Sequence, residues 1–323
     1  MSKSEFKKFT VDELKTRLDK FLAERVSDLS GKIISRSKIQ RDIESGQVTV
    51  NGVAQNSPKF AVRKDDEITY EIIPEEKPGP KDIPLHTLYN NHGLLILDKP
   101  AGLVVHPGAG FKGDSLAQAL LFHFKDIHLV GEEGRSGIVH RLDKDTSGVI
   151  LIALTQEMYE HLKDAFEKRK IKKEYIALVK GRMPEKHGKI DSPLGKSQKD
   201  FRKYTTNIED MVREKPSLTE YWVMDYFTSI ESGGVDFYTL IRVKLHTGRT
   251  HQIRVHFSSL GYPLIGDELY GGKKVTKIGD KVIARQFLHA KKIEVQLPNN
   301  EWIEAESEIP KDLQDILKNL KKL

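Results

Sequence analysis

Apolar residues recur at two periods along the chain, and the change of period predicts where helices give way to strands. In the first 73 residues, two segments have helical spacing, residues 11–26 and residues 37–45. The apolar positions of the first segment are Val11, Leu14, Leu18, Phe21 and Leu22. Residues 47–55 and 67–73 alternate in the manner of strands, with a strong turn signal at Asn51-Gly52. A small module of two helices and a sheet is therefore expected here.

Residues 74–84 interrupt both periods. The sequence IPEEKPGPKDIP, residues 73–84, contains four prolines and one glycine among several charges. Such a segment continues neither a helix nor a central strand, so it predicts a stiff linker. The linker separates the small module, residues 1–73, from a larger body, residues 85–323.

The body carries many strand-like segments and few helical ones. Strands are predicted at residues 93–100, 147–154, 173–181, 219–227, 237–246 and 291–297. Helices are predicted at residues 115–124, 156–169 and 310–323. Because helices do not alternate regularly with the strands, we expect an α+β fold with a mainly antiparallel mixed β-sheet and flanking helices. The last helix has one apolar stripe, which predicts packing on the body; binding of a partner is the alternative.

Composition narrows the class of protein. The chain has 323 residues, enough for two domains, and Lys and Arg outnumber Asp and Glu by 53 to 47. That mild basic surplus favours a polyanionic partner without requiring one. The absence of cysteine excludes disulfides and a thiol nucleophile, and it fits a reducing cytoplasm. A polar N-terminus and the lack of an apolar run of about 20 residues predict a cytoplasmic protein with no membrane span.

The most distinctive chemistry lies where charged residues meet an apolar strand. HRLDKDTSG, residues 140–148, precedes five consecutive apolar residues, 149–153, which are enough for a strand buried on both faces. An isolated DxDT is most simply a turn, but a turn does not require the preceding His140 and Arg141. An aspartyl phosphatase is a second interpretation. The chain does not match the DxDx[TV] motif of that family, because Thr146 comes one position early. The apolar strand also follows the motif here, whereas in that family it precedes the motif.

A second cluster, HTGRTHQIRVH, spans residues 246–256. Its three histidines are five residues apart, a spacing that places them together neither on a helix nor on a strand, so no metal site is predicted. Arg249 and Arg254 instead lie near Ile253. Fixed cations beside an apolar side chain suit a flat, partly polar ligand.

Two further segments are basic. KRKIKK, residues 168–173, either complements the end of a helix or contacts RNA. In the small module, Arg36, Lys38 and Arg41 follow one another with no acidic residue between them. On a helix, Lys38 and Arg41 share a face, which favours binding to a phosphate backbone.

Several of these motifs occur together, in the same order, in one known family. HRLDKDTSG, KKEYIALVKG, HTGRTHQIRVH and GYPLIGDELYG resemble the RluA/RluD family of RNA pseudouridine synthases, and the resemblance extends from residue 94 to residue 298. TRLDKFLAE, SRSKIQRDIESGQVTVNG and DDEITY, all within residues 16–70, resemble an S4-like RNA-binding domain. The resemblance therefore implies a small α+β S4-like domain at residues 1–73 and a catalytic domain at residues 85–323.

The resemblance also assigns roles to five residues of the body. Asp143 matches the family's catalytic nucleophile, and Tyr175 matches the tyrosine that stacks on the target base and is a candidate base in the later proton transfer. Arg249 matches the basic residue that forms an ion pair with the aspartate. Arg141 matches an arginine that stabilises the flipped-out nucleotide, and Ile253 matches an apolar residue placed against the uracil. In the S4-like domain, the RNA-binding candidates are Arg17, Arg36, Lys38 and Arg41.

The chemistry agrees with the resemblance. Isomerising uridine to pseudouridine involves no net oxidation, so the reaction needs neither a redox cofactor nor ATP. The target base must leave its stack before it can react. We therefore expect a cytoplasmic, monomeric RNA pseudouridine synthase that acts on large-subunit ribosomal RNA without a metal or a cofactor. A catalytically inactive RNA-binding assembly factor of the same fold is the alternative, but it would lack a member of the trio Asp143, Tyr175 and Arg249.

Overall fold

The chain forms two compact units, Met1–Pro78 and Gly79–Leu323. The computed structural model describes residues 4–27, 31, 33–73, 79–106, 113–132, 134–231, 234–271, 277–278 and 281–323. The division between the units falls within the segment predicted as a linker, of which residues 74–78 lie outside the described residues. In the described part of the chain, no helix is both long and apolar enough to cross a membrane.

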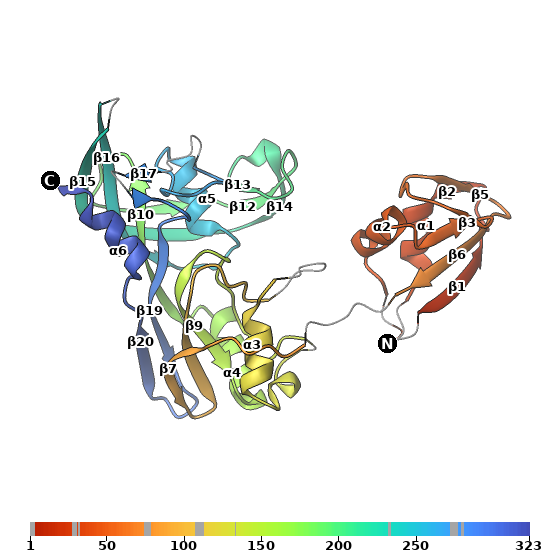
Figure 1. Cartoon of the computed structure of the whole chain (residues 1–323), viewed down its shortest axis with the longest axis horizontal. Coiled ribbons are helices and arrows are strands. Elements are labelled where there is room, and N and C mark those ends of the chain that lie inside the picture. Colours follow the sequence, from red (N-terminus) through yellow and green to blue (C-terminus); the bar gives the residue numbers. More distant parts are fainter. Residues whose placement is uncertain are drawn as a thin grey trace. The chain divides into compact units, whose positions relative to one another are not determined.

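The N-terminal unit contains a four-stranded antiparallel sheet and two helices (Figure 1). The sheet has the order β1-β6-β3-β4. Its strands are β1 (Glu5–Thr10), β3 (Val48–Val50), β4 (Val53–Ala54) and β6 (Glu67–Ile72), and β2 (Lys15–Arg17) pairs separately with β5 (Ala61–Arg63). Asn51 and Gly52 join β3 to β4 with φ angles of 51° and 79°, the left-handed pair that a tight hairpin requires.

The two helices of this unit pack their apolar faces on the sheet. α2 (Arg36–Glu44) agrees with the prediction, but α1 (Leu18–Arg25) begins at Leu18 rather than at residue 11. The prediction of a helix over residues 11–17 is wrong. Val11 instead forms backbone hydrogen bonds with residues 65 and 66, in the turn before β6, and these bonds hold the chain beyond the end of β1. Leu14 is accordingly exposed. The buried core includes Leu18, Phe21, Leu22, Ile39 and Ile43.

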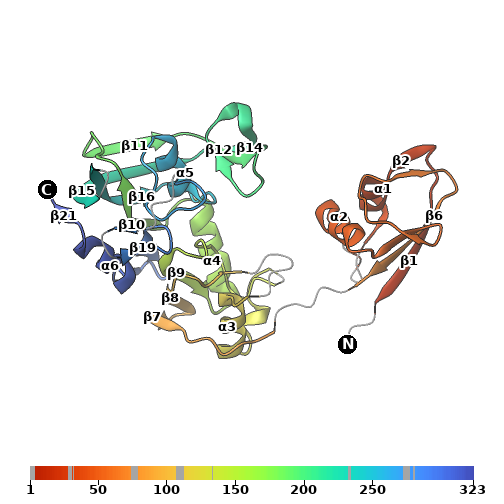
Figure 2. The same ribbon diagram turned by 45° about the horizontal axis from the view of Figure 1, so that its top comes forward.

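The C-terminal unit is built on a ten-stranded sheet (Figures 1 and 2). The central order is β11-β15-β16-β10-β19-β9-β8-β7, with β20 added to β19 and β21 added to β15. The strands are β7 (His86–Asn91), β8 (Leu94–Lys99), β9 (Ser147–Ala153), β10 (Lys172–Lys180), β11 (His187–Asp191), β15 (Leu218–Glu231), β16 (Gly234–Leu245), β19 (Leu288–Gln296), β20 (Trp302–Glu306) and β21 (Lys321–Lys322). Among its described pairings only β9 with β19 is parallel, which confirms the predicted mainly antiparallel mixed sheet.

Smaller elements surround this sheet. The helices are α3 (Leu116–His123), α4 (Gln156–Glu167), α5 (Gln252–Ser259) and α6 (Lys311–Lys318), with 3-10 turns at Ile127–Leu129 and Ile208–Asp210. A three-stranded sheet, which the sequence pattern did not predict, contains β12 (Leu194–Ser197), β13 (Tyr204–Thr205) and β14 (Met211–Lys215). β17 (Lys277–Ile278) pairs with β18 (Lys281–Val282) in antiparallel register.

The helices cover both faces of the central strands. α3 and α5 pack on one face, where the strand residues include Leu95, Leu97, Ile150, Ile152 and Val243. α4 packs on the other face of β8 and β9, where the strand residues include Leu94, Ile96, Val149 and Leu151. Every residue of β9 is buried, as its unbroken apolar run predicted. The strand that follows the HRLD motif is therefore a fixed support for it.

The C-terminal helix packs on the body, as its apolar stripe predicted. Leu313 and Ile316 are buried in a cluster with Ile176 and Leu240 of the sheet. The helix is shorter than predicted, since α6 ends at Lys318 and the chain continues as β21. β21 pairs with β15, and Leu323 is exposed.

Gly148 allows β9 to approach β19 closely. Its φ is 111°, and a Cβ at this position would lie 2.2 Å from the carbonyl oxygen of Ala290, its partner in the parallel register. We expect Gly148→Ala to lower the free energy of unfolding by about 3 kcal/mol or more, because the strained φ and the backbone clash add. Urea unfolding of the full chain measures this. The control is Gly261→Ala, where φ is 84° but the space is open; equal losses in the two variants would contradict the role of the close approach.

Candidate active site

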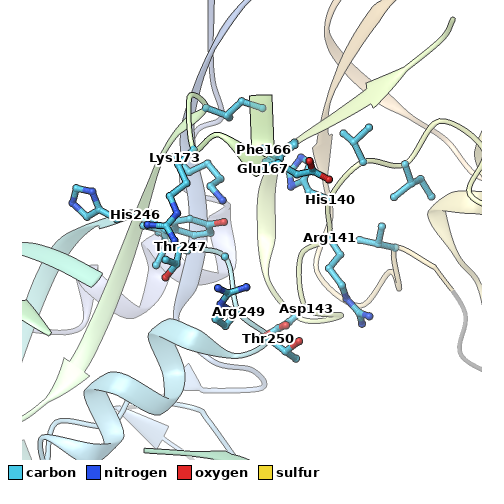
Figure 3. Close-up of a pocket in the computed structure, with 18 of the residues that line it drawn as sticks. His140, Arg141, Asp143, Phe166, Glu167, Lys173, His246, Thr247, Arg249 and Thr250 are labelled. Carbon is cyan, nitrogen blue, oxygen red and sulfur yellow. The ribbon is translucent and has the colours of Figure 1, made fainter. Parts of the chain in front are cut away.

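A cleft of about 650 Å³ brings the two charged motifs of the body together (Figure 3). It is formed by the loop before β9, the end of α4, the start of β10 and the loop between β16 and α5. Residues 138–141 and Asp143 line one part, and residues 245–250 line another. Volumes of this order are typical of sites that enclose a small organic ligand.

Asp143 lies in the turn that leads into β9, and buried cations hold this turn. Lys99 is 1% exposed and donates hydrogen bonds to the carbonyl oxygens of Pro100 (2.7 Å), Leu103 (2.9 Å) and Lys144 (3.0 Å). Burial lowers the pKa of Lys99 to about 8, although the charges of nearby aspartates oppose this. Arg285 donates to the carbonyl oxygen of Asp145 at 2.9 Å. The backbone on the C-terminal side of Asp143 is therefore fixed by two side chains from distant segments.

The carboxylate of Asp143 forms an ion pair with Arg254 of α5. The Nη1 atom of Arg254 lies 3.0 Å from Oδ2 of Asp143, and the Asp143 side chain keeps 18% of its surface exposed. Arg254 is itself held by Asp267, which accepts hydrogen bonds from Nε at 2.6 Å and Nη2 at 2.9 Å. Burial alone would lower the pKa of Arg254, but its bonds to Asp267 and Asp143 raise it. A permanently charged guanidinium thus lies between two carboxylates.

The ion pair expected between Arg249 and Asp143 is not formed; Arg254 takes this place. The Nε atom of Arg249 donates to the carbonyl oxygen of Pro216 at 3.1 Å. His251 adopts a left-handed conformation, with φ of 57°, directly before α5 begins at Gln252. That turn separates the two arginines of the motif, so Arg254 reaches Asp143 from the helix. Arg249 still lines the cleft near Asp143, and its catalytic role remains a prediction (Figure 3).

Three other residues assigned by resemblance also border Asp143. Tyr175 of β10 is 7% exposed, and Ile253 of α5 is 3% exposed. Both line a small recess that Asp143 shares. Burial and the charge of Asp143 raise the pKa of Tyr175, so its hydroxyl stays protonated at neutral pH. Arg141 is exposed and borders the cleft and the recess.

The histidines near the cleft make separate hydrogen bonds. Nε2 of His140 accepts from the backbone NH of Leu151 at 2.8 Å, and burial together with the charge of Lys173 lowers the pKa of His140 to about 3. His251 is hydrogen-bonded to Tyr270 at 2.8 Å, and its Nε2 lies 3.8 Å from Oδ1 of Asp143. Burial lowers the pKa of His251. At neutral pH the rings of His140 and His251 are therefore uncharged, and their hydrogen bonds hold them in place beside the cleft.

In the N-terminal unit, the cations proposed from the sequence surround a carboxylate. Asp19 is fully buried and accepts hydrogen bonds from Arg17 (2.9 Å), Arg36 (3.0 Å) and Gln40 (2.6 Å). Burial alone would raise the pKa of Asp19, but these bonds hold it below its usual value. The Arg17 and Arg36 side chains keep 42% and 47% of their surfaces exposed. Both remain accessible to solvent.

The remaining two candidates of this unit lie on α2. Lys38 pairs with Asp42 at 3.2 Å and is partly buried, whereas Arg41 is exposed. The ion pair with Asp42 and the buried Asp19 were not foreseen. Asp42 directly follows Arg41 in the sequence, and Asp19 lies 17 positions before Arg36, so the charge pattern of residues 36–41 alone gave no sign of either.

Sequence reasoning missed Asp267 and the anchoring roles of Lys99 and Arg285. Asp267 belongs to the quoted motif GYPLIGDELYG, and Lys99 belongs to LLILDKPAG, so both were within the region of resemblance. Their signal was a charged residue inside a mainly apolar motif, which in a folded protein needs a buried partner. Arg285 lies just before FLHAKK and carries no comparable signal.

Comparison with known families gives a direct assignment. Residues 93–259 match the family model described as RNA pseudouridylate synthase, and residues 16–68 match the S4 domain. Together these matches define a two-domain RNA-modifying enzyme. The chain belongs to the RNA pseudouridylate synthase family, whose members are isomerases that act on RNA. The family, the S4 domain and the fold class expected from the sequence are thus confirmed.

Individual relatives agree with the family. An uncharacterized RNA pseudouridine synthase of Aquifex aeolicus (strain VF5) is 40% identical over 276 residues, which cover 84% of this chain and 82% of the relative. The ribosomal large subunit pseudouridine synthase D of Haemophilus ducreyi is 36% identical over 323 residues, covering 97% and 93%. Among solved structures, Human RNA Pseudouridylate Synthase Domain Containing 1 matches with a TM-score of 0.60 and 26% identity, covering 76% of this chain and 91% of that one.

Proposed function

We propose that this enzyme converts uridines of large-subunit ribosomal RNA to pseudouridine, with Asp143 as the nucleophile. The observation that carries the proposal is the position of Asp143: a partly exposed carboxylate in a cleft, ion-paired with a buried arginine. The choice of RNA rests on the relative from Haemophilus ducreyi, whose name states that substrate and whose length matches almost completely. All side chains used here come from one chain, and we expect a monomer acting in the cytoplasm.

The reaction detaches uracil from its ribose, turns it and rejoins it through a carbon atom. That carbon loses a hydrogen and the former bonding nitrogen gains one, so the product is an isomer and no electrons are supplied. Asp143 bonds transiently to the uridine and is released when uracil rejoins the ribose through carbon, while Arg254, 3.0 Å away, holds the carboxylate in position. Asp267 keeps Arg254 in place while the Asp143 carboxylate reacts.

The walls of the recess fit a flipped base. Tyr175 presents an aromatic ring and Ile253 an apolar side chain beside Asp143, which suits stacking on one side and contact on the other. The raised pKa of Tyr175 keeps its hydroxyl protonated, so this group can donate a hydrogen bond to the flipped base. Arg141, exposed at the rim, is in a position to contact the phosphate backbone of the extruded nucleotide.

The S4 domain is proposed to grip the RNA backbone through Arg17, Arg36, Lys38 and Arg41. We expect Arg36→Gln to weaken RNA binding and to reduce the slope of log affinity against log salt by roughly 0.7–0.9, the effect of one phosphate contact. Filter binding across salt concentrations measures both. The matched control is Arg25→Gln, because Arg25 already pairs with Asp12 at 2.9 Å and covers the ring of Phe21. Equal slopes in both variants would count against the proposed RNA surface.

A site-resolved pseudouridine map of total RNA tests the function. Cells with and without the gene are compared, and loss of signal at discrete uridines of large-subunit RNA is expected in the deletion. Loss confined to transfer RNA would keep the reaction and overturn the substrate. Identical maps would favour the inactive assembly factor over the enzyme.

A further inference from the structure

One cation of the cleft has no part in the proposed mechanism. Lys173 lies on β10 two residues before Tyr175, so both side chains leave the same face of the strand, about 7 Å apart along it. Figure 3 shows Lys173 in the cleft opposite Phe166 and His140. The lysine therefore lies one step along the strand from the ring that is proposed to stack on the uracil.

The environment of Lys173 is that of a binding group rather than a structural ion pair. Its Nζ atom lies 5.3 Å from the centroid of the Phe166 ring, and a Cβ on Gly248 would lie 3.2 Å from it. Among the described residues, no carboxylate lies within ion-pair distance of Lys173, although the neighbouring Lys172 and Lys292 pair with Glu294. Its ammonium is partly buried without a counter-charge.

Charges around the cleft indicate the kind of ligand. Arg135, Arg141, Arg169 and Arg249 also line it, against the carboxylates of Asp143 and Glu167 among the described residues. The His140 ring lies 4.8 Å from the Phe166 ring and stays neutral, so it does not repel the ammonium of Lys173. An anion is the ligand that such a site favours, and RNA supplies one at every phosphate.

We infer that Lys173 binds a phosphate of the RNA strand beside the flipped uridine, which makes it a residue that positions the substrate. This inference rests on the proposed function, because it assumes that the uridine enters the recess at Tyr175. The ammonium lies over the Phe166 ring and beside Gly248. A phosphate held there fixes how far the strand can slide relative to Asp143.

The test compares Lys173→Met with Lys173→Arg in the full-length chain. Methionine keeps an unbranched side chain of similar length without the charge, and arginine keeps the charge. Binding to a transcript of large-subunit ribosomal RNA is measured in the Asp143→Asn background, which prevents turnover. We expect Lys173→Met to lose affinity roughly tenfold and the salt slope to fall by roughly 0.7–0.9, while Lys173→Arg retains both.

The affinity for RNA, measured over a series of pH values, distinguishes a charged contact from a role of Lys173 in packing alone. Burial lowers the pKa of Lys173 to about 8, and a bound phosphate would raise it again. The affinity of the enzyme with lysine is therefore full below pH 8 and decreases as the pH rises above 8. The arginine and methionine variants should show no such decrease.

The other groups facing Lys173 do not account for that change. Glu167 and Arg169 lie at the end of α4, and Asp143 and Arg141 in the loop before β9. His246 and Arg249 face the cleft from the loop after β16. Burial holds the pKa of Tyr175 above its usual value, so its hydroxyl does not ionise near pH 8. The arginine variant keeps all of these groups.

Each outcome decides the inference. Equal affinities and equal salt slopes in the lysine and methionine enzymes would overturn it. Equal losses in the methionine and arginine variants would also overturn it, because shape rather than charge would then matter. Pseudouridine formation by the unaltered enzyme on the same transcript is scored separately: its failure rejects the proposed function, while the binding comparison still reports whether Lys173 contacts a phosphate.

Discussion

Asp143→Asn is expected to abolish pseudouridine formation while RNA binding persists. Asparagine has nearly the same shape as aspartate but is not a nucleophile under these conditions, so turnover should fall by about four orders of magnitude or more. Arg254 remains paired with Asp267 through two hydrogen bonds, which preserves the surrounding structure. Turnover is measured by release of tritium from RNA labelled at uracil C5, and affinity by filter binding.

The matched control is Asp145→Asn, two positions further along the same turn. This change removes an equal charge, but the contact that anchors the turn here is the backbone oxygen of Asp145 with Arg285, which the substitution keeps. Turnover should stay within about twofold of the unaltered enzyme. Substantial residual turnover in Asp143→Asn, or an equal loss in the control, would reject Asp143 as the nucleophile.

Arg254→Met is expected to damage both the fold and the reaction. The substitution leaves Asp267 fully buried without its cation, and an uncompensated buried charge costs about 3–5 kcal/mol. Asp143 also loses the group that orients it, so turnover in the folded fraction should fall by roughly 10²-fold. Urea unfolding and single-turnover kinetics at a temperature where the variant is folded measure the two effects.

Two further variants separate these effects. Arg249→Met removes an equal charge from the same motif, but Arg249 is only partly buried and donates to one carbonyl oxygen, so its stability loss should be below about 1.5 kcal/mol. Adding Asp267→Asn to Arg254→Met removes the buried unpaired charge and should restore much of the lost stability without restoring turnover. If the double variant is no more stable than Arg254→Met, the unpaired charge is not the cause.

The sequence predicted six strands of the central sheet, β8, β9, β10, β15, β16 and β19, because their signal is local; β7, β11, β20 and β21 were not predicted. The apolar run of β9 matches a strand in which every residue is buried. The three-stranded sheet of β12–β14 escaped prediction because its strands have only two to five residues and mostly polar side chains. Residues 11–17 had helical spacing, yet pairing of Val11 with the distant turn at residues 65–66 prevented a helix.

At the site, residue types could be predicted but partners could not. Asp143, Tyr175 and Ile253 lie around one recess, as the family resemblance implied. The choice between Arg249 and Arg254 as the partner of Asp143 depends on where α5 begins and on the left-handed turn at His251, and neither follows from local pattern. The buried Asp19 beside Arg17 and Arg36 is likewise set by how α1 packs against α2.

The order of strands also has a consequence for synthesis of the enzyme. β7, β8 and β9 form one ribbon and β10, β16, β15 and β11 another, and β19 is the strand that joins them. Asp143 precedes the first ribbon's last strand, whereas Tyr175 belongs to the second. A nascent chain that has not yet reached Leu288 therefore lacks the strand that joins the ribbon behind Asp143 to the ribbon that carries Tyr175. β19 thus completes the sheet on which the arrangement of Asp143 and Tyr175 depends.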